Sequence, residues 1–223
     1  MSATKRFLKK RKYEVLLLAL ILHLFIGIVL SDLEFYTRVV WPINMLILGV
    51  ATIGVFVEKG KWKNRLRNFL FILVLLLPIS ISFLGQLPNF MQVLSWVYAL
   101  YFIFIFWEIV RFLVKPSYIN IDIISASACG FLLLIEITVF VLQALFYSNP
   151  DSISGISQAN PASTYIDLVY LSCIIQTTIG FGDITPSSHS TKLVASVFGI
   201  IGQFYTVVLV GILISKFNSR KDT

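Results

Sequence analysis

The sequence of 223 residues is 57% hydrophobic and only 13% charged, which excludes an ordinary soluble domain and a disordered chain. Its formal net charge of +7 is compatible with nucleic-acid binding, but the basic residues flank apolar runs and are not interleaved with exposed aromatic residues. We therefore expect no nucleic-acid partner. The two cysteines, Cys129 and Cys173, fall within apolar stretches and are interpreted as packing residues.

Six apolar runs are long enough to cross a bilayer as helices, which takes about 20 residues each. They lie at residues 14–30, 39–57, 69–87, 91–113, 122–147 and 192–215. A basic N-terminus precedes the first run, as in a signal peptide, but no small-residue cleavage site follows, so we expect a retained transmembrane helix. Pro42 and Pro78, within the second and third runs, are expected to be tolerated kinks.

The basic residues predict how the runs are oriented. Apart from Arg38 and Lys192, every Lys and Arg lies before the first run, after the second, at or beyond the end of the fourth, or after the sixth. Under the positive-inside rule this pattern predicts six crossings with both termini in the cytoplasm. We expect an integral, multi-pass protein in contact with membrane lipid, located in a plasma membrane such as the bacterial inner membrane.

The runs divide into two parts. Residues 1–115 are predicted to form a four-helix transmembrane block, 116–120 a linker, and 121–223 an outer helix, a re-entrant segment and an inner helix. The fourth run contains no basic residue before Arg111, whereas a voltage sensor needs several regularly spaced arginines. The block is therefore interpreted as a scaffold with little voltage sensitivity.

The half-polar stretch 164–183 must enter the membrane and return to the same side. Thr164 and Asp167 form a variant of the capping box, which predicts the start of a helix that runs to Gln176. Gly180 and Gly182 then follow at alternate positions. A backbone whose carbonyls all face one axis alternates between right- and left-handed dihedrals, and glycine suits the left-handed positions. Potassium can exchange its water shell for such carbonyls, and the helix C-terminus also favours a cation.

Residues 178–183, with the sequence TIGFGD, resemble the signature filter of potassium channels. The resemblance continues in a pore-helix start (167–172), a filter exit (184–186) and an inner-helix motif (202–205) similar to that of bacterial six-transmembrane channels with an ion-transport pore domain. It covers residues 121–216, whereas residues 1–115 match only in helix count.

The resemblance implies an all-α membrane protein with six transmembrane helices, and with a re-entrant pore helix and filter between the fifth and sixth. Each chain would supply one filter strand, so it implies a homotetramer. The implied ion-coordinating residues are Thr178, Ile179, Gly180, Phe181 and Gly182, with K+ at the first four, supported by Asp183, Thr177 and Tyr170. Phe181 replaces the commoner tyrosine and lacks a hydroxyl that could tether the filter. Potassium is the permeant ion, and we expect neither a cofactor nor an enzymatic activity.

The last run is expected to contain the gate. Gly202 is interpreted equally as a hinge or as a close-packing glycine, and Thr206, Val210 and Ile214 are expected to face the pore axis and form an apolar inner gate. Because eight residues follow Ser215, gating is expected at the filter, through lipid or through a regulatory partner that the sequence leaves open.

Two polar residues within apolar runs need an explanation. Glu136 is expected to be protonated or hydrogen-bonded to the pore-helix layer, with a structural role. His23 is interpreted as a packing residue and not as a ligand.

The function predicted from the sequence is a passive potassium-selective channel with weak or no voltage dependence. The alternative within the class is a non-selective monovalent cation channel, which would be expected to alter the Gly-Phe-Gly core. An uptake transporter with four pore repeats and a non-conducting subunit are disfavoured by the single re-entrant segment and the intact filter.

Overall fold

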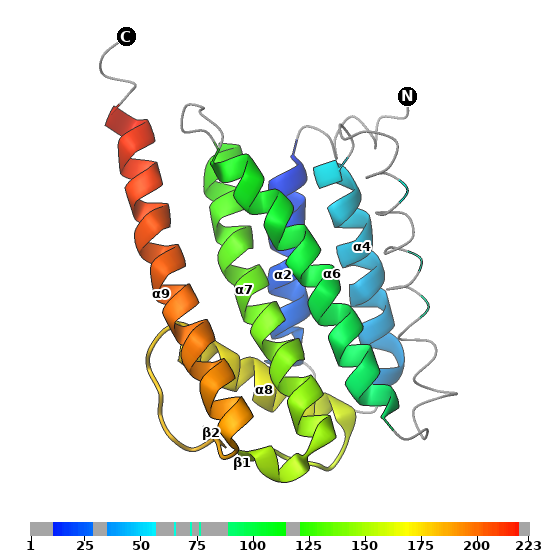
Figure 1. Cartoon of the computed structure of the whole chain (residues 1–223). Coiled ribbons are helices and arrows are strands. Elements are labelled where there is room, and N and C mark those ends of the chain that lie inside the picture. Colours follow the sequence, from blue (N-terminus) through cyan, green and yellow to red (C-terminus); the bar gives the residue numbers. More distant parts are fainter. Residues whose placement is uncertain are drawn as a thin grey trace.

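The computed structural model describes residues 11–28, 35–56, 89–114 and 121–218, together with the single positions 65, 72 and 76. The α-helices of this part of the chain are α2 (Lys12–Phe25), α4 (Trp41–Phe56), α6 (Phe90–Leu113), α7 (Ile121–Ser148), α8 (Pro161–Gln176) and α9 (His189–Asn218). A 3₁₀ turn (Ile26–Ile28) extends α2, and another, Pro150–Ser152, follows α7. The long helices lie side by side with α9 at one edge, and the shorter α8 lies behind the lower parts of α7 and α9 in the view of Figure 1.

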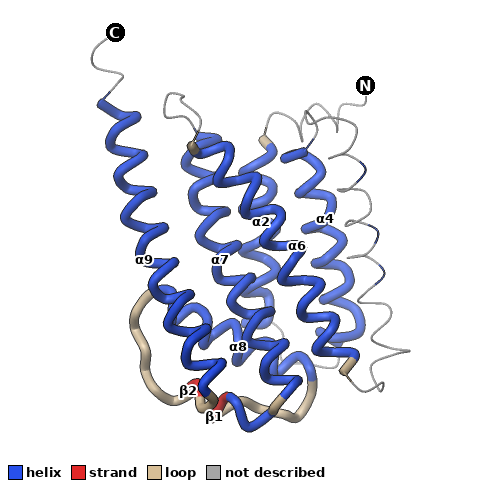
Figure 2. Tube along the Cα trace, in the orientation of Figure 1, coloured by secondary structure: helices blue, strands red, loops and turns tan. Residues whose placement is uncertain are grey.

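Strand structure in the described residues is limited to one short pair. The strand β1 (Ile153–Ser154) runs antiparallel to β2 (Thr185–Pro186) and joins the segment after α7 to the segment before α9. Figure 2 shows this pair at the end of the molecule where α8 lies. The predicted all-α architecture is therefore confirmed for the described part of the chain, apart from this two-residue ladder.

Three of the predicted spans form helices long and apolar enough to cross a membrane, judged by length and composition. They are Phe90–Leu113, Ile121–Ser148 and His189–Leu209. The first and second predicted spans form the shorter helices α2 and α4, of 14 and 16 residues. Pro78, the linker 116–120 and the third predicted span apart from positions 72 and 76 lie outside the described residues, so six crossings stay a prediction.

Pro42 lies at a junction between two helical forms. It occupies the first turn of α4, directly after a π-helical turn, η2 (Tyr36–Val40). Proline has no N–H to donate, and because the chain is already helical from Tyr36, the missing donor falls within a continuous helical segment, where a local π-type adjustment can accommodate it. The predicted tolerance of proline in this run is thus met by a change of helix type at its beginning.

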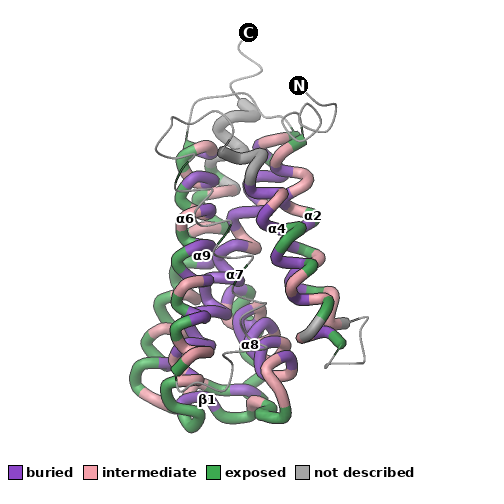
Figure 3. Tube along the Cα trace, turned by 90° about the vertical axis from the view of Figure 1, so that its right-hand side faces the viewer, coloured by how far each residue is buried: buried purple, intermediate pink, exposed green. Residues whose placement is uncertain are grey.

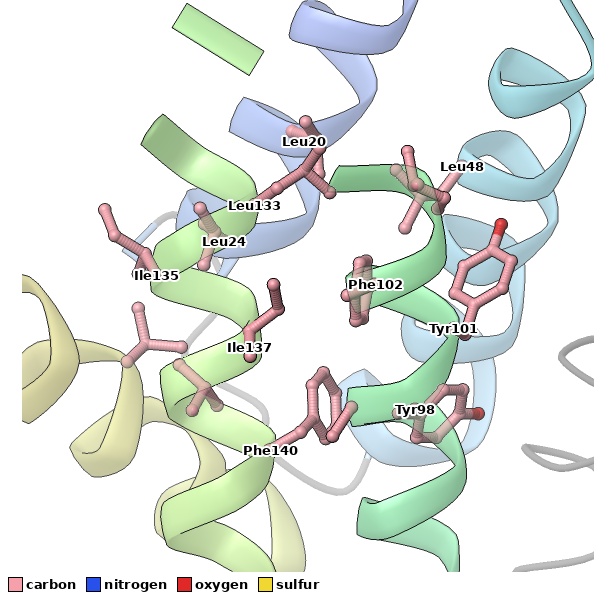
Figure 4. Packing of buried hydrophobic residues seen from close by; sticks show 14 of the residues in the cluster. Leu20, Leu24, Leu48, Tyr98, Tyr101, Phe102, Leu133, Ile135, Ile137 and Phe140 are labelled. Carbon is pink, nitrogen blue, oxygen red and sulfur yellow. The ribbon is translucent and has the colours of Figure 1, made fainter. Parts of the chain in front are cut away.

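The helix α7 lies at the centre of the core. In the most apolar window of α7, 83% of the residues are buried, against 11% for α9. Leu20 of α2, Leu48 of α4 and Phe102 of α6 are buried in the hydrophobic cluster that also contains Leu133 and Phe140 of α7 (Figure 4). The Phe102 and Phe140 rings stack with centroids 5.5 Å apart. Close van der Waals packing of this kind holds membrane helices together, because lipid provides little hydrophobic drive.

A glycine allows α9 to approach α7. A Cβ atom on Gly130 would overlap the hydroxyl of Tyr205, and this hydroxyl donates a hydrogen bond to the Ser127 carbonyl at 2.8 Å. Small residues in membrane helices allow close approaches of this type. The helices α7 and α9 are therefore tied together in the half of the bundle away from α8.

Candidate ion-selectivity filter

The helix α8, which leads into the predicted filter, begins four residues earlier than expected, with its N-cap at Asn160 and not at Thr164. Asn160 is its N-cap: its side-chain oxygen accepts from the Ser163 backbone N–H at 2.8 Å, and its own N–H donates to Ser163 Oγ at 3.3 Å. Pro161 follows at the first helical position, where proline is favoured. The predicted capping box at Thr164 and Asp167 is therefore wrong, because a stronger Asn-Pro start lies just before it.

Thr164 and Asp167 instead fasten the preceding loop to α8. The Thr164 hydroxyl donates to the Ser157 carbonyl at 2.9 Å, and Asp167 Oδ2 accepts from the Ser157 N–H at 2.7 Å. Both backbone groups of one loop residue are thus satisfied by the first two turns of α8. The helix ends at Gln176, as predicted.

In the segment after α8, every second residue has a positive φ angle. The φ angles of Thr178, Gly180 and Gly182 are 59°, 55° and 82°. The left-handed conformation predicted for the two glycines is confirmed, and Thr178 continues the alternation by one step. A β-branched residue rarely adopts positive φ, and such strain, about 1–3 kcal/mol, is concentrated at functional sites. Among the described residues, apart from each glycine and its two chain neighbours, no heavy atom lies within 4 Å of a Cβ built on either glycine, so within one chain the backbone angle and not crowding favours glycine here.

The filter begins by wrapping around the end of α8. The N–H groups of Thr177, Thr178 and Ile179 donate to carbonyls of the last helical turn, at 3.0, 3.1 and 3.0 Å. The Thr177 hydroxyl also donates to the Cys173 carbonyl at 2.7 Å. Thr177, predicted as a filter support, therefore helps to terminate the helix and aim the strand that follows.

The whole predicted filter lies on the surface of the chain. Every residue from 177 to 183 is exposed, and the hydrophobic side chains of Ile179 and Phe181 are 56% and 70% exposed. The loop lies beside α9 on the side away from α2, α4 and α6 (Figures 1 and 2). The strained backbone of this loop is therefore accessible from outside the chain. Backbone carbonyls in such a loop can coordinate a cation.

Tyr170 and Asp183, both predicted supports, are brought together at the outer end of the filter. The Tyr170 hydroxyl donates to Asp183 Oδ2 at 2.8 Å, and Asp183 Oδ1 accepts from the Ile184 N–H at 3.0 Å. The hydrogen bond from Tyr170 lowers the pKa of Asp183 below its usual value. The Tyr170 ring also lies parallel to that of Phe181, with centroids 6.5 Å apart. Tyr170 thus supplies a tether that Phe181, without a hydroxyl, cannot.

A brace on the filter exit was missed by the sequence analysis. A Cβ on Gly155, whose φ is 87°, would lie 2.5 Å from the Asp183 carbonyl oxygen, so only glycine fits there. Next to it, the Ser154 and Ser187 hydroxyls are 2.6 Å apart, and the Ser187 N–H donates to the Ser152 carbonyl at 2.8 Å. The turn at Gly155 is visible in the sequence, but its partner across the filter is not.

Gln176 links the pore helix to both flanking helices. Its side chain is 1% exposed, and its Nε2 donates to Thr138 Oγ1 of α7 at 3.0 Å. A Cβ on Gly202 of α9 would overlap Gln176 Oε1 and lie 3.0 Å from Gln176 Cδ. Since α9 is a continuous helix through Gly202, the packing interpretation of this glycine is the one that the geometry favours. The hinge stays a prediction.

The predicted inner gate is described only in part. Thr206 is exposed on α9, and its hydroxyl donates to the Gly202 carbonyl at 3.0 Å. The side chains of Val210 and Ile214 lie outside the described part of the structure, so the gate also stays a prediction.

Comparisons with known proteins agree with this geometry. Residues 131–219 match a family model described as "Ion channel", a range that includes most of α7, all of α8 and the candidate filter. "Two pore potassium channel a" of Oryza sativa subsp. japonica is 34% identical over 92 residues, which are 41% of this chain and 24% of that protein. "Two-pore potassium channel 1" of Arabidopsis thaliana is 37% identical over 71 residues, 32% of this chain and 17% of that protein. The chain therefore spans a quarter or less of these relatives, and no significant match was found among solved structures.

The contact between Gly202 and Gln176 predicts the effect of adding one methyl group. Gly202→Ala should displace the Gln176 side chain and destabilise the fold by about 1–3 kcal/mol, the usual cost of overpacking. Thermal unfolding of the purified protein measures this loss. Gly199→Ala is the matched control, because a Cβ there would lie 3.7 Å from Ile175, an ordinary contact.

Shortening the Gln176 side chain should restore part of the stability lost in Gly202→Ala. Gln176→Ala combined with Gly202→Ala should recover part of the lost melting temperature, because the new methyl group then has room. If the double variant is no better than Gly202→Ala alone, the glycine is needed for bending and not for packing.

The bond between Tyr170 and Asp183 predicts a dependence on pH. Because this bond lowers the pKa of Asp183, its support is present above the usual Asp pKa and is lost as the pH falls through the lowered pKa. Tyr170→Phe should return the pKa towards about 3.9, so protonation should occur at a higher pH than in the wild type. Titration of the Asp183 carboxyl by NMR with selective labelling checks this, and an unchanged pKa in the variant would contradict it.

Proposed function

We propose that the chain is a subunit of a potassium-selective channel that conducts K+ passively across a membrane. The observation that carries this proposal is the alternating backbone of residues 178–182, with positive φ at Thr178, Gly180 and Gly182. Carbonyls of Thr178, Ile179, Gly180 and Phe181 would replace the water shell of the ion. The C-terminal end of α8, which lies next to the first of these residues, adds a partial negative charge that favours a cation.

We propose further that four copies close around the ion. One exposed loop can cover only one side of a cation, so other chains must supply the remaining oxygens. Beside the loop, α9 exposes an apolar stripe with helical spacing that a neighbouring copy or lipid would cover. The stripe consists of Leu193, Val197, Ile200, Phe204 and Val208.

The match of residues 131–219 to an ion-channel family and the potassium-channel names of the relatives support potassium as the permeant ion. Residues 121–223 would be the pore domain, and residues 1–115 would be the scaffold. In Figure 1, α4 and α6 run in the same direction, as a further crossing between them would require. This direction supports six spans with both termini on one side of the membrane, as in the bacterial six-transmembrane type, and the distribution of Lys and Arg favours the cytoplasm as that side.

Weak voltage dependence remains part of the proposal. The helix α6 carries no basic residue before Arg111, and Arg111 Nη1 lies 3.7 Å from the Glu108 carboxylate on the same helix. A paired charge at the end of a helix is poorly placed to move through the membrane field.

Ion flux tests the filter directly. Protein reconstituted in liposomes should pass potassium and largely exclude sodium. Gly180→Ala should abolish selective flux, because alanine at a φ of 55° costs about 1–2 kcal/mol in every subunit. Gly211→Ala in α9 is the control, since a Cβ there meets nothing within 4 Å, and it should conduct like the wild type. Equal sodium and potassium flux through the wild type would favour the non-selective alternative.

Assembly is a separate prediction. Native mass spectrometry of the detergent-solubilised protein should give a mass four times that of the 25.2 kDa chain. A monomer or dimer that still conducts potassium in liposomes would contradict the four-fold pore.

A further inference from the structure

A buried polar cluster joins three helices at the level of the pore helix. It consists of His23 in α2, Glu136 in α7 and Tyr165 in α8, which are 1%, 0% and 1% exposed. The expectation that Glu136 is hydrogen-bonded to the pore-helix layer is confirmed by its contact with Tyr165. His23, interpreted from sequence as a packing residue, is instead its closest polar partner.

The three side chains form one hydrogen-bonded unit. His23 Nδ1 lies 2.7 Å from Glu136 Oε1, and the Tyr165 hydroxyl lies 3.0 Å from the same nitrogen and 3.5 Å from Glu136 Oε2. The 2.7 Å contact requires a proton between the nitrogen and the carboxyl oxygen, and Nδ1 has only one site for it. The tyrosine proton is therefore directed to the other carboxyl oxygen, so each member depends on the other two.

Aromatic rings enclose this unit. Trp41 packs on Tyr165 with ring centroids 5.3 Å apart, Phe140 lies 5.9 Å from Tyr165, and Phe102 lies 6.2 Å from His23. A lone carboxylate in such surroundings is costly, whereas a carboxyl and an imidazole that share a proton can carry no net charge together. Figure 3 shows that the buried residues extend from α7 into α8, where this cluster lies.

The cluster contacts α8, the same helix that leads into the candidate filter. Tyr165 lies in the second turn of α8, and the helix continues without interruption to Gln176, next to the first filter residue. A shift of Tyr165 would therefore move or tilt the other end of α8. The helix α2 belongs to the N-terminal block, so the cluster is a direct polar connection between that block and the pore helix.

We propose that His23 and Glu136 are positioning residues for ion selection: by holding Tyr165, they fix the pore helix and, through it, the filter. This inference rests on the proposed channel function. It gives the N-terminal block a role in permeation that does not involve voltage sensing.

The test measures selectivity and not stability alone. Tyr165→Phe keeps the ring and its packing but removes the hydroxyl, and Glu136→Gln removes the carboxylate. Each should lower the ratio of potassium to sodium flux about tenfold. A tenfold change corresponds roughly to the free energy of one lost hydrogen bond to a charged group. The double variant should be no worse than either single variant, because both changes break the same unit.

Tyr98→Phe is the matched control. Tyr98 is also buried and packs on Phe140, with ring centroids 4.9 Å apart, but its hydroxyl has no hydrogen-bond partner within the described structure. This variant should keep wild-type selectivity. If it loses selectivity as much as Tyr165→Phe does, the effect is one of general packing and the inference is wrong.

The remaining outcomes also distinguish a role in ion selection from a purely structural role. If Tyr165→Phe lowers the melting temperature but leaves the flux ratio unchanged, the cluster is structural and the inference fails. Tyr165→Phe alone gives the answer if Glu136→Gln does not assemble. A wild-type protein that does not select potassium would overturn the proposed function itself, so the two failures are distinguishable.

Discussion

Three alternate residues, Thr178, Gly180 and Gly182, hold left-handed backbone dihedrals within one short exposed loop, and the surrounding structure serves to hold them there. Such a backbone has little local stability, because a threonine at positive φ is strained and the loop has no sheet partner at these residues. Three neighbouring segments support the loop. Tyr170 of α8 and Gly155 of the loop after α7 both contact Asp183, and Gln176, at the end of α8, packs against α9.

The helices behind the pore helix explain how this loop can be strained and still ordered. Polar contacts in a membrane protein are few, so each buried one connects particular helices. The Gln176–Thr138 bond and the contacts of Glu136 with His23 and Tyr165 both run through α7, the helix whose apolar window is 83% buried. The helix α7 therefore acts as the common support for the pore helix and for the N-terminal block.

Local features of the site could be predicted from the sequence, and long-range contacts could not. Glycine tolerates left-handed dihedrals without strain, so two glycines at alternate positions directly after a helix could be predicted to have positive φ, as Gly180 and Gly182 do. The start of α8 was misplaced because two capping signals overlap, and Asn-Pro is the stronger. His23 and Glu136 are 113 positions apart, and no periodicity in either helix specifies that they meet. The third predicted span lies outside the described residues apart from positions 72 and 76, so its prediction is not tested.

The central claim is that the exposed carbonyls of residues 178–181 bind dehydrated potassium on an axis shared by several chains. The most direct measurement is an experimental structure of the purified assembly in potassium and again in sodium. The account predicts four filter loops facing one axis, with density between successive carbonyl layers in potassium and a changed pattern in sodium. Filter loops that face lipid or detergent, or an axis without ion density in potassium, would contradict it.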